Sequence, residues 1–324
     1  MRIVVVGAGI GGLAFALSAH RLGLNVRVYE SVSTLKPLGV GLNLQPNAVR
    51  ELTELGLGDV LAKTAIPTGE LAFYSKHGQP IWSEPRGIAA GYKWPQFSIH
   101  RGALQMILLD AVRDRLGPDA VTTGHHLSRF TQNAAIVAAS FVDRRTEREL
   151  DAVECDVLIG ADGIHSAIRK ILYPDEGLPK YGKWVAFRGA VEGEPYLSGR
   201  TMVCVGTQDQ RVVMYPISRD AMDRGEALIN WVASLPMPSS GPLPPEEWNR
   251  TVPSETFLPE FKNWRFPWLD VAALLERTPQ VYEFPFVDRE PLPKWSVGRV
   301  TLLGDAAHPM YPIGSQAGSQ AIVD

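Results

Sequence analysis

MRIVVVGAGIGGLAFALSAHRLGLNVRVYE, residues 1–30, is the stretch of sequence that decides the fold. Residues 2–6 are an apolar, β-branched run, which predicts a buried parallel strand. Residues 11–22 predict a helix, and residues 25–29 alternate as a second strand. A strand, a helix and a strand in so short a segment predict a βαβ unit at the start of an α/β fold.

Three glycines join the first strand to the helix, in the pattern Gly7-x-Gly9-x-x-Gly12. Gly7 permits a tight turn, Gly9 lets a pyrophosphate approach the helix N-terminus, and Gly12 lets the helix pack on the strand. Glu30 ends the second strand, where a carboxylate accepts hydrogen bonds from a ribose and repels a 2′-phosphate. The stretch therefore predicts an FAD or NAD site, and the alternative is a strand–helix turn without a ligand.

Composition narrows the class of protein further. The 324 residues are 45% hydrophobic and 21% charged, which excludes a disordered chain, and the net charge of −3 gives no reason to expect nucleic acid or an anionic membrane as partner. The two cysteines, Cys155 and Cys204, are too few for a disulfide framework and indicate a cytoplasmic protein. No apolar stretch has the length of a membrane span.

The remaining chain divides into three parts. Residues 1–174 are predicted to form the nucleotide-binding domain, with residues 70–100 contributing to a second domain. Residues 175–295 hold the alternating strands of that β-rich domain, and residues 296–324 return to the first one. Further predicted elements are helices at 46–62, 101–116 and 268–277, a hairpin at 70–83, antiparallel strands within 120–150, strands at 156–159 and 299–303, and a Pro-rich loop at 236–248.

Two more motifs follow predicted strands. The first is GADGIHSAIR, residues 160–169, with Asp162 near its start, and the second is GDAAHPMYP, residues 304–312, with Asp305. Taken singly, each motif is a turn in which the aspartate caps a helix.

Taken together, the three motifs resemble the single-component (class A) FAD-dependent aromatic hydroxylases, the family that contains para-hydroxybenzoate and salicylate hydroxylases. The segments LGVGLNLQPNAV, WSEPRG, SIHRGALQMILL and VDREPLPKW are similar to the hydroxylases of phenazine carboxylates in that family. The resemblance covers essentially the whole chain. It implies a Rossmann-type FAD-binding domain, like that of para-hydroxybenzoate hydroxylase, interrupted by a β-sheet-rich substrate domain.

The resemblance also implies a set of residues that contact FAD. Gly7, Gly9 and Gly12 would hold the pyrophosphate, Glu30 the adenosine ribose, and Arg101 the phosphates or the ribityl chain. The whole set is Gly7, Gly9, Gly12, Glu30, Ser31, Val40, Gly41, Arg101, Asp162, Asp305, Gly314 and Gly318.

Four positions in this set have their own implied roles. The backbone around Gly41 would pass near the flavin, and Asp305 would hydrogen-bond the ribityl chain. Asp162 would belong to the motif that such enzymes share between FAD and NADPH. The helix that begins near Gly314 would point its N-terminus at the flavin pyrimidine.

The implied reaction is hydroxylation of an aromatic ring. NADPH or NADH would reduce the flavin, and O₂ would form a C4a-hydroperoxide that passes an oxygen atom to a phenazine-, salicylate- or phenol-like substrate. The sequence shows no hydrolase triad and no metal-ligand spacing among its seven histidines, so we expect the cofactor to perform the chemistry and no metal to take part.

Two residues of the β-rich domain are candidate catalytic residues. Arg188 lies in the strand WVAFRGAV, and Tyr215 in VVMYPIS. Arg188 is expected to pair with a substrate carboxylate or to hold the flavin ring, and Tyr215 to contact a substrate hydroxyl. The alternative is an ordinary half-buried sheet. Because no carboxylate lies nearby on the same strand face, Arg188 is expected to have the flavin or an acidic substrate as its partner.

Other functions stay open at this point. A flavin epoxidase or halogenase has a related fold, although WRFPW, residues 264–268, differs from the usual halogenase motif Trp-x-Trp-x-Ile-Pro. A non-catalytic or truncated flavin-binding protein is the other alternative. Family members continue through further helices, so the C-terminal helices of the FAD-binding domain are expected to be missing beyond Asp324. The sequence does not indicate which oligomeric state the protein adopts.

Overall fold

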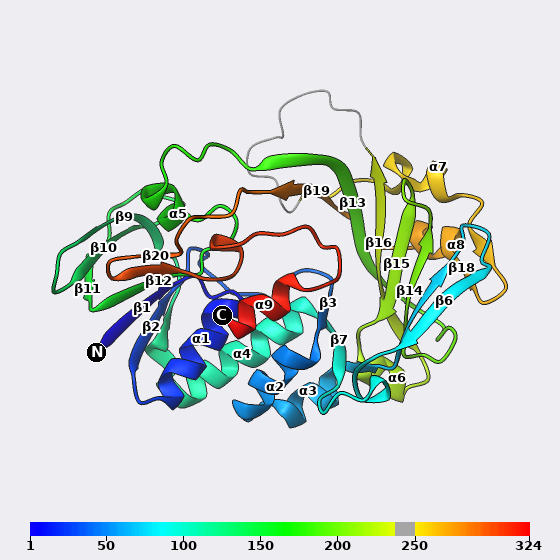
Figure 1. The fold of residues 1–324 in the computed structure, drawn as a ribbon, viewed down its shortest axis with the longest axis horizontal. Helices are drawn as coiled ribbons and strands as arrows, with labels where there is room; N and C mark the ends of the chain where they lie inside the picture. Colours follow the sequence, from blue (N-terminus) through cyan, green and yellow to red (C-terminus); the bar gives the residue numbers. More distant parts are fainter. Residues whose placement is uncertain (237–249) are drawn as a thin grey trace.

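The computed structural model describes residues 1–236 and 250–324, and it contains two large β-sheets of different design (Figure 1). A mainly parallel sheet with helices lies on one side, and an antiparallel-rich sheet on the other. The loop predicted at 236–248 lies, apart from Pro236, outside the described residues.

The first sheet has six strands in the order β20-β21-β12-β1-β2-β8, and all but β20 run parallel. The predicted βαβ unit at the N-terminus is confirmed as β1, α1 and β2, as is the predicted α/β class. The strands are β1 (Arg2–Val6), β2 (Asn25–Tyr29), β8 (Val121–Thr122), β12 (Val157–Gly160), β20 (Ser296–Val297) and β21 (Val300–Leu302).

The apolar run of β1 is explained by burial on both of its faces. Ile3 and Val5 belong to one core with α1 (Ile10–Arg21) and α4 (Arg101–Leu116). Val4 and Val6 belong to a second core under a three-stranded sheet, β11-β10-β9. A strand that is covered on both faces needs no polar side. The covering strands are β9 (His126–Gln132), β10 (Val137–Val142) and β11 (Val153–Cys155).

The second large sheet has seven strands in the order β19-β13-β16-β15-β14-β5-β6. The hairpin predicted at 70–83 is confirmed as β5 and β6, which join this sheet. The strands are β5 (Glu70–Tyr74), β6 (Pro80–Pro85), β13 (Lys180–Gly193), β14 (Thr201–Gly206), β15 (Arg211–Pro216), β16 (Ala227–Pro236) and β19 (Tyr282–Asp288).

The two faces of this seven-stranded sheet differ in burial. The back face carries buried residues such as Phe187 and Trp231, which pack with residues from α7 (Leu258–Phe261) and α8 (Val271–Glu276). Phe187 stacks on Phe257 with ring centroids 4.6 Å apart. Alternate residues, which make up the front face, are half-buried along much of β14 and β15. The front face carries Asn230 and Tyr215, which contact Gly41 of β3 (Gly41–Leu44), so it is turned toward the first sheet and its helices.

One predicted helix is wrong in length. Residues 46–62 were predicted as a single helix, but they form α2 (Pro46–Glu54) and α3 (Gly58–Thr64). The break is at Gly56, whose φ of +75° ends α2 in a left-handed conformation that glycine adopts without strain.

The remaining elements connect the sheets. A small antiparallel sheet, β3-β7-β4, lies between them. Its other strands are β4 (Ile66–Thr68) and β7 (Gln96–His100), the further helices are α5 (Ala167–Leu172), α6 (Arg219–Asp223) and α9 (Ala317–Val323), and a short hairpin is formed by β17 (Arg265–Phe266) and β18 (Leu269–Asp270). Within residues 1–236 and 250–324, no helix is long and apolar enough to cross a membrane.

Candidate active site

The glycine turn after β1 lies at the carboxyl end of the parallel sheet. A Cβ on Gly7 would lie 2.3 Å from the Ala161 carbonyl oxygen, and one on Gly12 would lie 2.1 Å from the Gly7 carbonyl oxygen. Nothing lies within 4 Å of the position of a Cβ on Gly9. Gly7 and Gly12 are therefore required by packing, whereas Gly9 faces open space at the N-cap of α1, where a phosphate would bind.

The Glu30 carboxylate is aimed at this turn from the end of β2. Its Oε2 accepts a hydrogen bond of 2.7 Å from the Ala8 amide, and its Oε1 accepts one of 3.0 Å from the Ser31 hydroxyl. Gln105 of α4 holds the same turn from the other side, because its side-chain amide donates to the Ala8 carbonyl at 2.8 Å. Sequence reasoning did not find Gln105, since it is one polar residue within an apolar helix.

Replacing Glu30 with alanine is expected to weaken FAD binding by about 1–3 kcal/mol, which is the scale of hydrogen bonds lost to a charged group. The dissociation constant of FAD, measured by titrating the apoprotein and following flavin fluorescence, checks this. Glu226→Ala is the control for the substitution itself, because this exposed carboxylate pairs with Arg224 away from the glycine turn. An unchanged dissociation constant in Glu30→Ala would show that Glu30 only orders the turn.

Asp162 follows β12, next to the glycine turn. Its Oδ2 accepts hydrogen bonds from the amides of Ala167 (2.8 Å) and Ile168 (3.3 Å), so it caps α5. Its Oδ1 is buried and has no hydrogen-bond partner among the described residues. Burial raises the pKa of this carboxyl, opposed by hydrogen bonds from Ser166 and the backbone. The capping role predicted as the alternative is present, and the cofactor role stays a prediction.

Arg101, at the start of α4, and Asp305, which follows β21, lie close enough for each charge to influence the pKa of the other. Both side chains are accessible to solvent. Even so, desolvation by the surrounding protein has the largest effect on the pKa of each group. It lowers the pKa of Arg101, which the nearby Arg188 lowers further. It raises the pKa of Asp305, and His308 and Arg101 oppose this rise.

The seven-stranded sheet is joined to the small sheet β3-β7-β4 at Gly41, the first residue of β3. Its amide donates to the Asn230 Oδ1 at 2.6 Å, and its carbonyl accepts from the Arg188 Nη2 at 3.0 Å. A Cβ on Gly41 would lie 2.5 Å from the Asn230 Cγ and 2.7 Å from a Tyr215 ring carbon. Only glycine fits here. Sequence reasoning missed Asn230, although a single amide side chain within the apolar strand β16 could have indicated a polar contact there.

Arg188 and Tyr215 lie on the front face of the seven-stranded sheet. In β16, Val232 is paired with Arg188 and Asn230 with Tyr215, so their side chains share one face. Burial lowers the pKa of Arg188, opposed by the adjacent Tyr215 hydroxyl, and burial raises the pKa of Tyr215, opposed by Arg188. The guanidinium lies 5.5 Å from the centre of the Phe284 ring. Among the described residues, Arg188 has no carboxylate partner and its Nε has no hydrogen bond.

The loop before α9 completes the surroundings. Gly314 has a φ of +81°, and a Cβ on Gly318 would lie 2.9 Å from the Leu42 Cδ1. Ser319 accepts a hydrogen bond of 2.9 Å from the Gln45 amide at the start of α2. The structure thus places Gly318, in α9, against Leu42 of β3, and the contact of Gly314 and Gly318 with a flavin stays a prediction.

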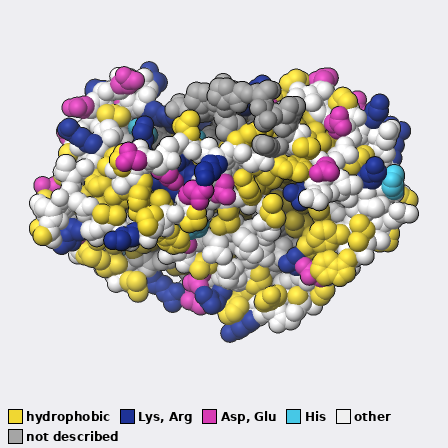
Figure 2. Space-filling model, turned by 45° about the horizontal axis from the view of Figure 1, so that its top comes forward, with side chains coloured by type: hydrophobic (Ala, Val, Ile, Leu, Met, Phe, Trp, Pro, Cys, Tyr) yellow, Lys and Arg dark blue, Asp and Glu magenta, His cyan; other side chains and the backbone are white. Residues whose placement is uncertain are grey.

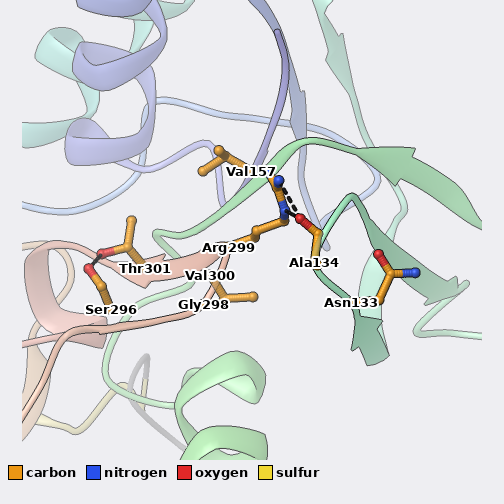
Figure 3. Close-up of a pocket in the computed structure, with 8 residues that line it drawn as sticks. All are labelled: Asn133, Ala134, Val157, Ser296, Gly298, Arg299, Val300 and Thr301. Carbon is orange, nitrogen blue, oxygen red and sulfur yellow. Dashed lines mark hydrogen bonds between the residues drawn. The ribbon is translucent and has the colours of Figure 1, made fainter.

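A separate shallow pocket lies at the opposite end of the parallel sheet (Figure 3). It borders the amino ends of β12 and β21, whereas dinucleotides bind at the carboxyl ends of parallel strands. Its Arg299 already donates hydrogen bonds to the carbonyls of Ala134 and Asp156. The residues around the pocket are Asn133, Ala134, Val157, Ser296, Gly298, Arg299, Val300 and Thr301, and their arrangement gives no reason to assign a ligand.

The surface charge is mixed. On the face shown in Figure 2, the Lys and Arg side chains of the described residues are interspersed with Asp and Glu. This distribution matches the small net charge of the chain and offers no extended cationic track for a nucleic-acid backbone.

A parallel sheet with a glycine turn at its carboxyl edge, beside an antiparallel-rich sheet, defines a dinucleotide-binding α/β protein. The chain belongs to the family described as FAD binding domain, whose model matches residues 1–324. It is 45% identical over 327 residues to phenazine 1,6-dicarboxylic acid hydroxylase PhzS of Lysobacter antibioticus, covering 99% of this chain and 80% of that protein.

Two further comparisons agree. The chain is 32% identical to 6-hydroxynicotinate 3-monooxygenase of Pseudomonas fluorescens, over 100% of this chain and 80% of that protein. A crystal structure of HpxO from Klebsiella pneumoniae with FAD and uric acid matches with a TM-score of 0.80 and 25% identity, over 99% of this chain and 77% of that one. The class predicted from the sequence, an FAD-dependent aromatic monooxygenase, is confirmed.

The residues present fit FAD. The open space at Gly9 leaves room for a pyrophosphate, and the Glu30 carboxylate lies beside it. Arg101 lies near Asp305 and also near Arg188 of the second sheet, so charged groups are present between the glycine turn and the front face of that sheet.

Proposed function

We propose that the protein hydroxylates a planar aromatic carboxylic acid, phenazine-like or salicylate-like, with NAD(P)H and O₂. The observation that carries this proposal is Arg188, a partly buried guanidinium on the front face with no carboxylate partner among residues 1–236 and 250–324. An unpaired buried cation is costly, so an anionic ligand beside it is favoured. The similarity to a hydroxylase of a phenazine dicarboxylic acid supports the same class of substrate.

In this proposal, FAD extends from the glycine turn to the front face of the seven-stranded sheet. Gly9 and Glu30 hold its pyrophosphate and ribose, and Arg101 and Asp305 the chain that leads to the ring. Gly41 and the loop at Gly314 border the ring itself. Bound FAD, after reduction by NAD(P)H, supplies the activation of O₂.

The protein residues position the substrate and keep water away. Arg188 binds the carboxylate or the flavin ring, while its bond to the Gly41 carbonyl fixes the guanidinium. The Tyr215 hydroxyl, beside that guanidinium, is placed to hydrogen-bond a substrate hydroxyl. The half-buried apolar side chains of the front face cover the aromatic ring and exclude water from the reaction.

A panel of aromatic acids tests the proposal. The FAD-loaded protein is expected to oxidise NAD(P)H faster when a phenazine or salicylate carboxylate is added, and to release a product heavier by one oxygen atom. The uncharged parent ring of each acid is the control, and it should stimulate far less. Tight FAD binding without stimulation by any acid would identify a flavin-binding protein instead. A cytoplasmic location is also a proposal, and it rests on the two free cysteines.

A further inference from the structure

A second arginine lies on the same face of the sheet as Arg188. Arg211 begins β15, and burial alternates from it along the strand, with Arg211 and Val213 half-buried and Val212 and Met214 buried. In the sheet register, Arg211 is paired with Ser234, and Val213 with Val232, the residue that is also paired with Arg188. Because paired and alternate residues share a face, both arginines project from the front face of the sheet.

Arg211 is held by an aromatic ring rather than by an acid. Its guanidinium lies 5.8 Å from the centre of the Trp184 ring, and Trp184 precedes Arg188 by four residues on the same face of β13. Within the described part of the chain, no carboxylate lies within 4.0 Å of Arg211. Burial raises the pKa of Cys204 on the neighbouring strand, and the positive charge of Arg211 opposes this shift. Among residues 1–236 and 250–324, the positive charge of Arg211 therefore has no acidic counter-ion.

The side chains of Val213 and Val232, which lie between the two arginines on this face, are apolar. Arg188 and Arg211 lie two strands apart and two residues out of register, so their Cα atoms are separated by roughly 12 Å on ordinary sheet spacings. Val213 and Val232 lie between them and are half-buried, which means that a ligand can rest on them. A planar aromatic ring system with an anionic group at each end has the matching shape and charge.

We propose that Arg211, stacked on Trp184, is a second anion-binding subsite that selects aromatic substrates with two carboxylates. Arg188 binds one carboxylate or the adjoining cofactor, and Arg211 binds the carboxylate at the far end of the ring system. This inference rests on the proposed function, because it assigns a second anchor for the same aromatic acid. It makes Arg211 a determinant of substrate specificity and leaves the flavin contacts unchanged.

The test compares two ligands that differ by one carboxylate, phenazine 1,6-dicarboxylate and phenazine 1-carboxylate. Each is titrated into the FAD-loaded protein, and its dissociation constant is read from the change in flavin absorbance. Arg211→Gln is expected to weaken the dicarboxylate by roughly tenfold or more, the scale of a lost charged hydrogen bond, and the monocarboxylate by less than about threefold. Arg211→Lys should give a dissociation constant for the dicarboxylate between those of the native protein and Arg211→Gln. Arg219→Gln, on the exposed helix α6, is the matched control and should change neither value.

The outcomes separate the subsite from the proposed function. If the native protein binds and hydroxylates both ligands, and Arg211→Gln weakens both equally or neither, the second subsite is wrong and the proposed function stands. If the native protein binds neither ligand and oxidises no NAD(P)H in response, both are wrong. The FAD content and the melting temperature of each variant show whether a loss of ligand binding reflects misfolding. If Arg211→Gln is misfolded, the dissociation constants of Arg211→Lys decide whether the second subsite exists.

Discussion

Gly9→Val is expected to abolish FAD binding and to leave the protein folded. Gly9 has φ −72° and ψ 179°, an extended conformation that any residue adopts, and a Cβ there would meet no atom within 4 Å. The valine side chain would fill the space that a pyrophosphate needs at the start of α1. The loss of a glycine N-cap costs only about 1 kcal/mol of stability.

The prediction is checked by measuring the flavin content of the purified variant together with its melting temperature. Gly12→Ala is the contrasting variant, because its Cβ would lie 2.1 Å from the Gly7 carbonyl oxygen. That overlap is expected to destabilise the protein by about 1–3 kcal/mol whether or not FAD is present. A Gly9→Val protein that purifies with a full complement of FAD would contradict the assignment of the site.

Local sequence patterns predicted the parts of the fold that depend on neighbouring residues. The strand over residues 2–6 is evident because both of its faces are covered, which makes every position apolar. The helix predicted at 46–62 is wrong because Gly56 adopts a left-handed conformation, although the apolar pattern continues past it. The division into domains stays a prediction.

The candidate site was predicted less completely, because much of it joins residues far apart in the chain. The glycine turn and Glu30 lie within one βαβ unit, so their spacing alone predicts that they meet. The contact between Gly41 and Asn230 spans 189 residues, and only the packing of two sheets brings them together. Gln105 was missed for the same reason, since it reaches the glycine turn from another helix.

Arg188→Lys is expected to reduce substrate-stimulated turnover by roughly ten- to hundredfold, the scale of one or two charged hydrogen bonds. The guanidinium donates to the Gly41 carbonyl and lies over Phe284, and its Nε has no hydrogen-bond partner among the described residues. An ammonium keeps the charge but cannot make these contacts together. Because burial lowers the pKa of the cation at this position, the ammonium would also lose its proton more easily, so the defect should grow as the pH rises.

The measurement is the rate of NAD(P)H oxidation and of product formation with the best acid of the panel, at several pH values. FAD content and melting temperature should stay close to those of the native protein, because the Arg188 side chain is not needed to close either hydrophobic core. Arg219→Lys, an exposed arginine in an ion pair with Asp223, is the control for the substitution itself. If Arg188→Lys hydroxylates the substrate at the native rate, Arg188 is not part of the active site. Its bond to Gly41 is then a purely structural link between β13 and β3.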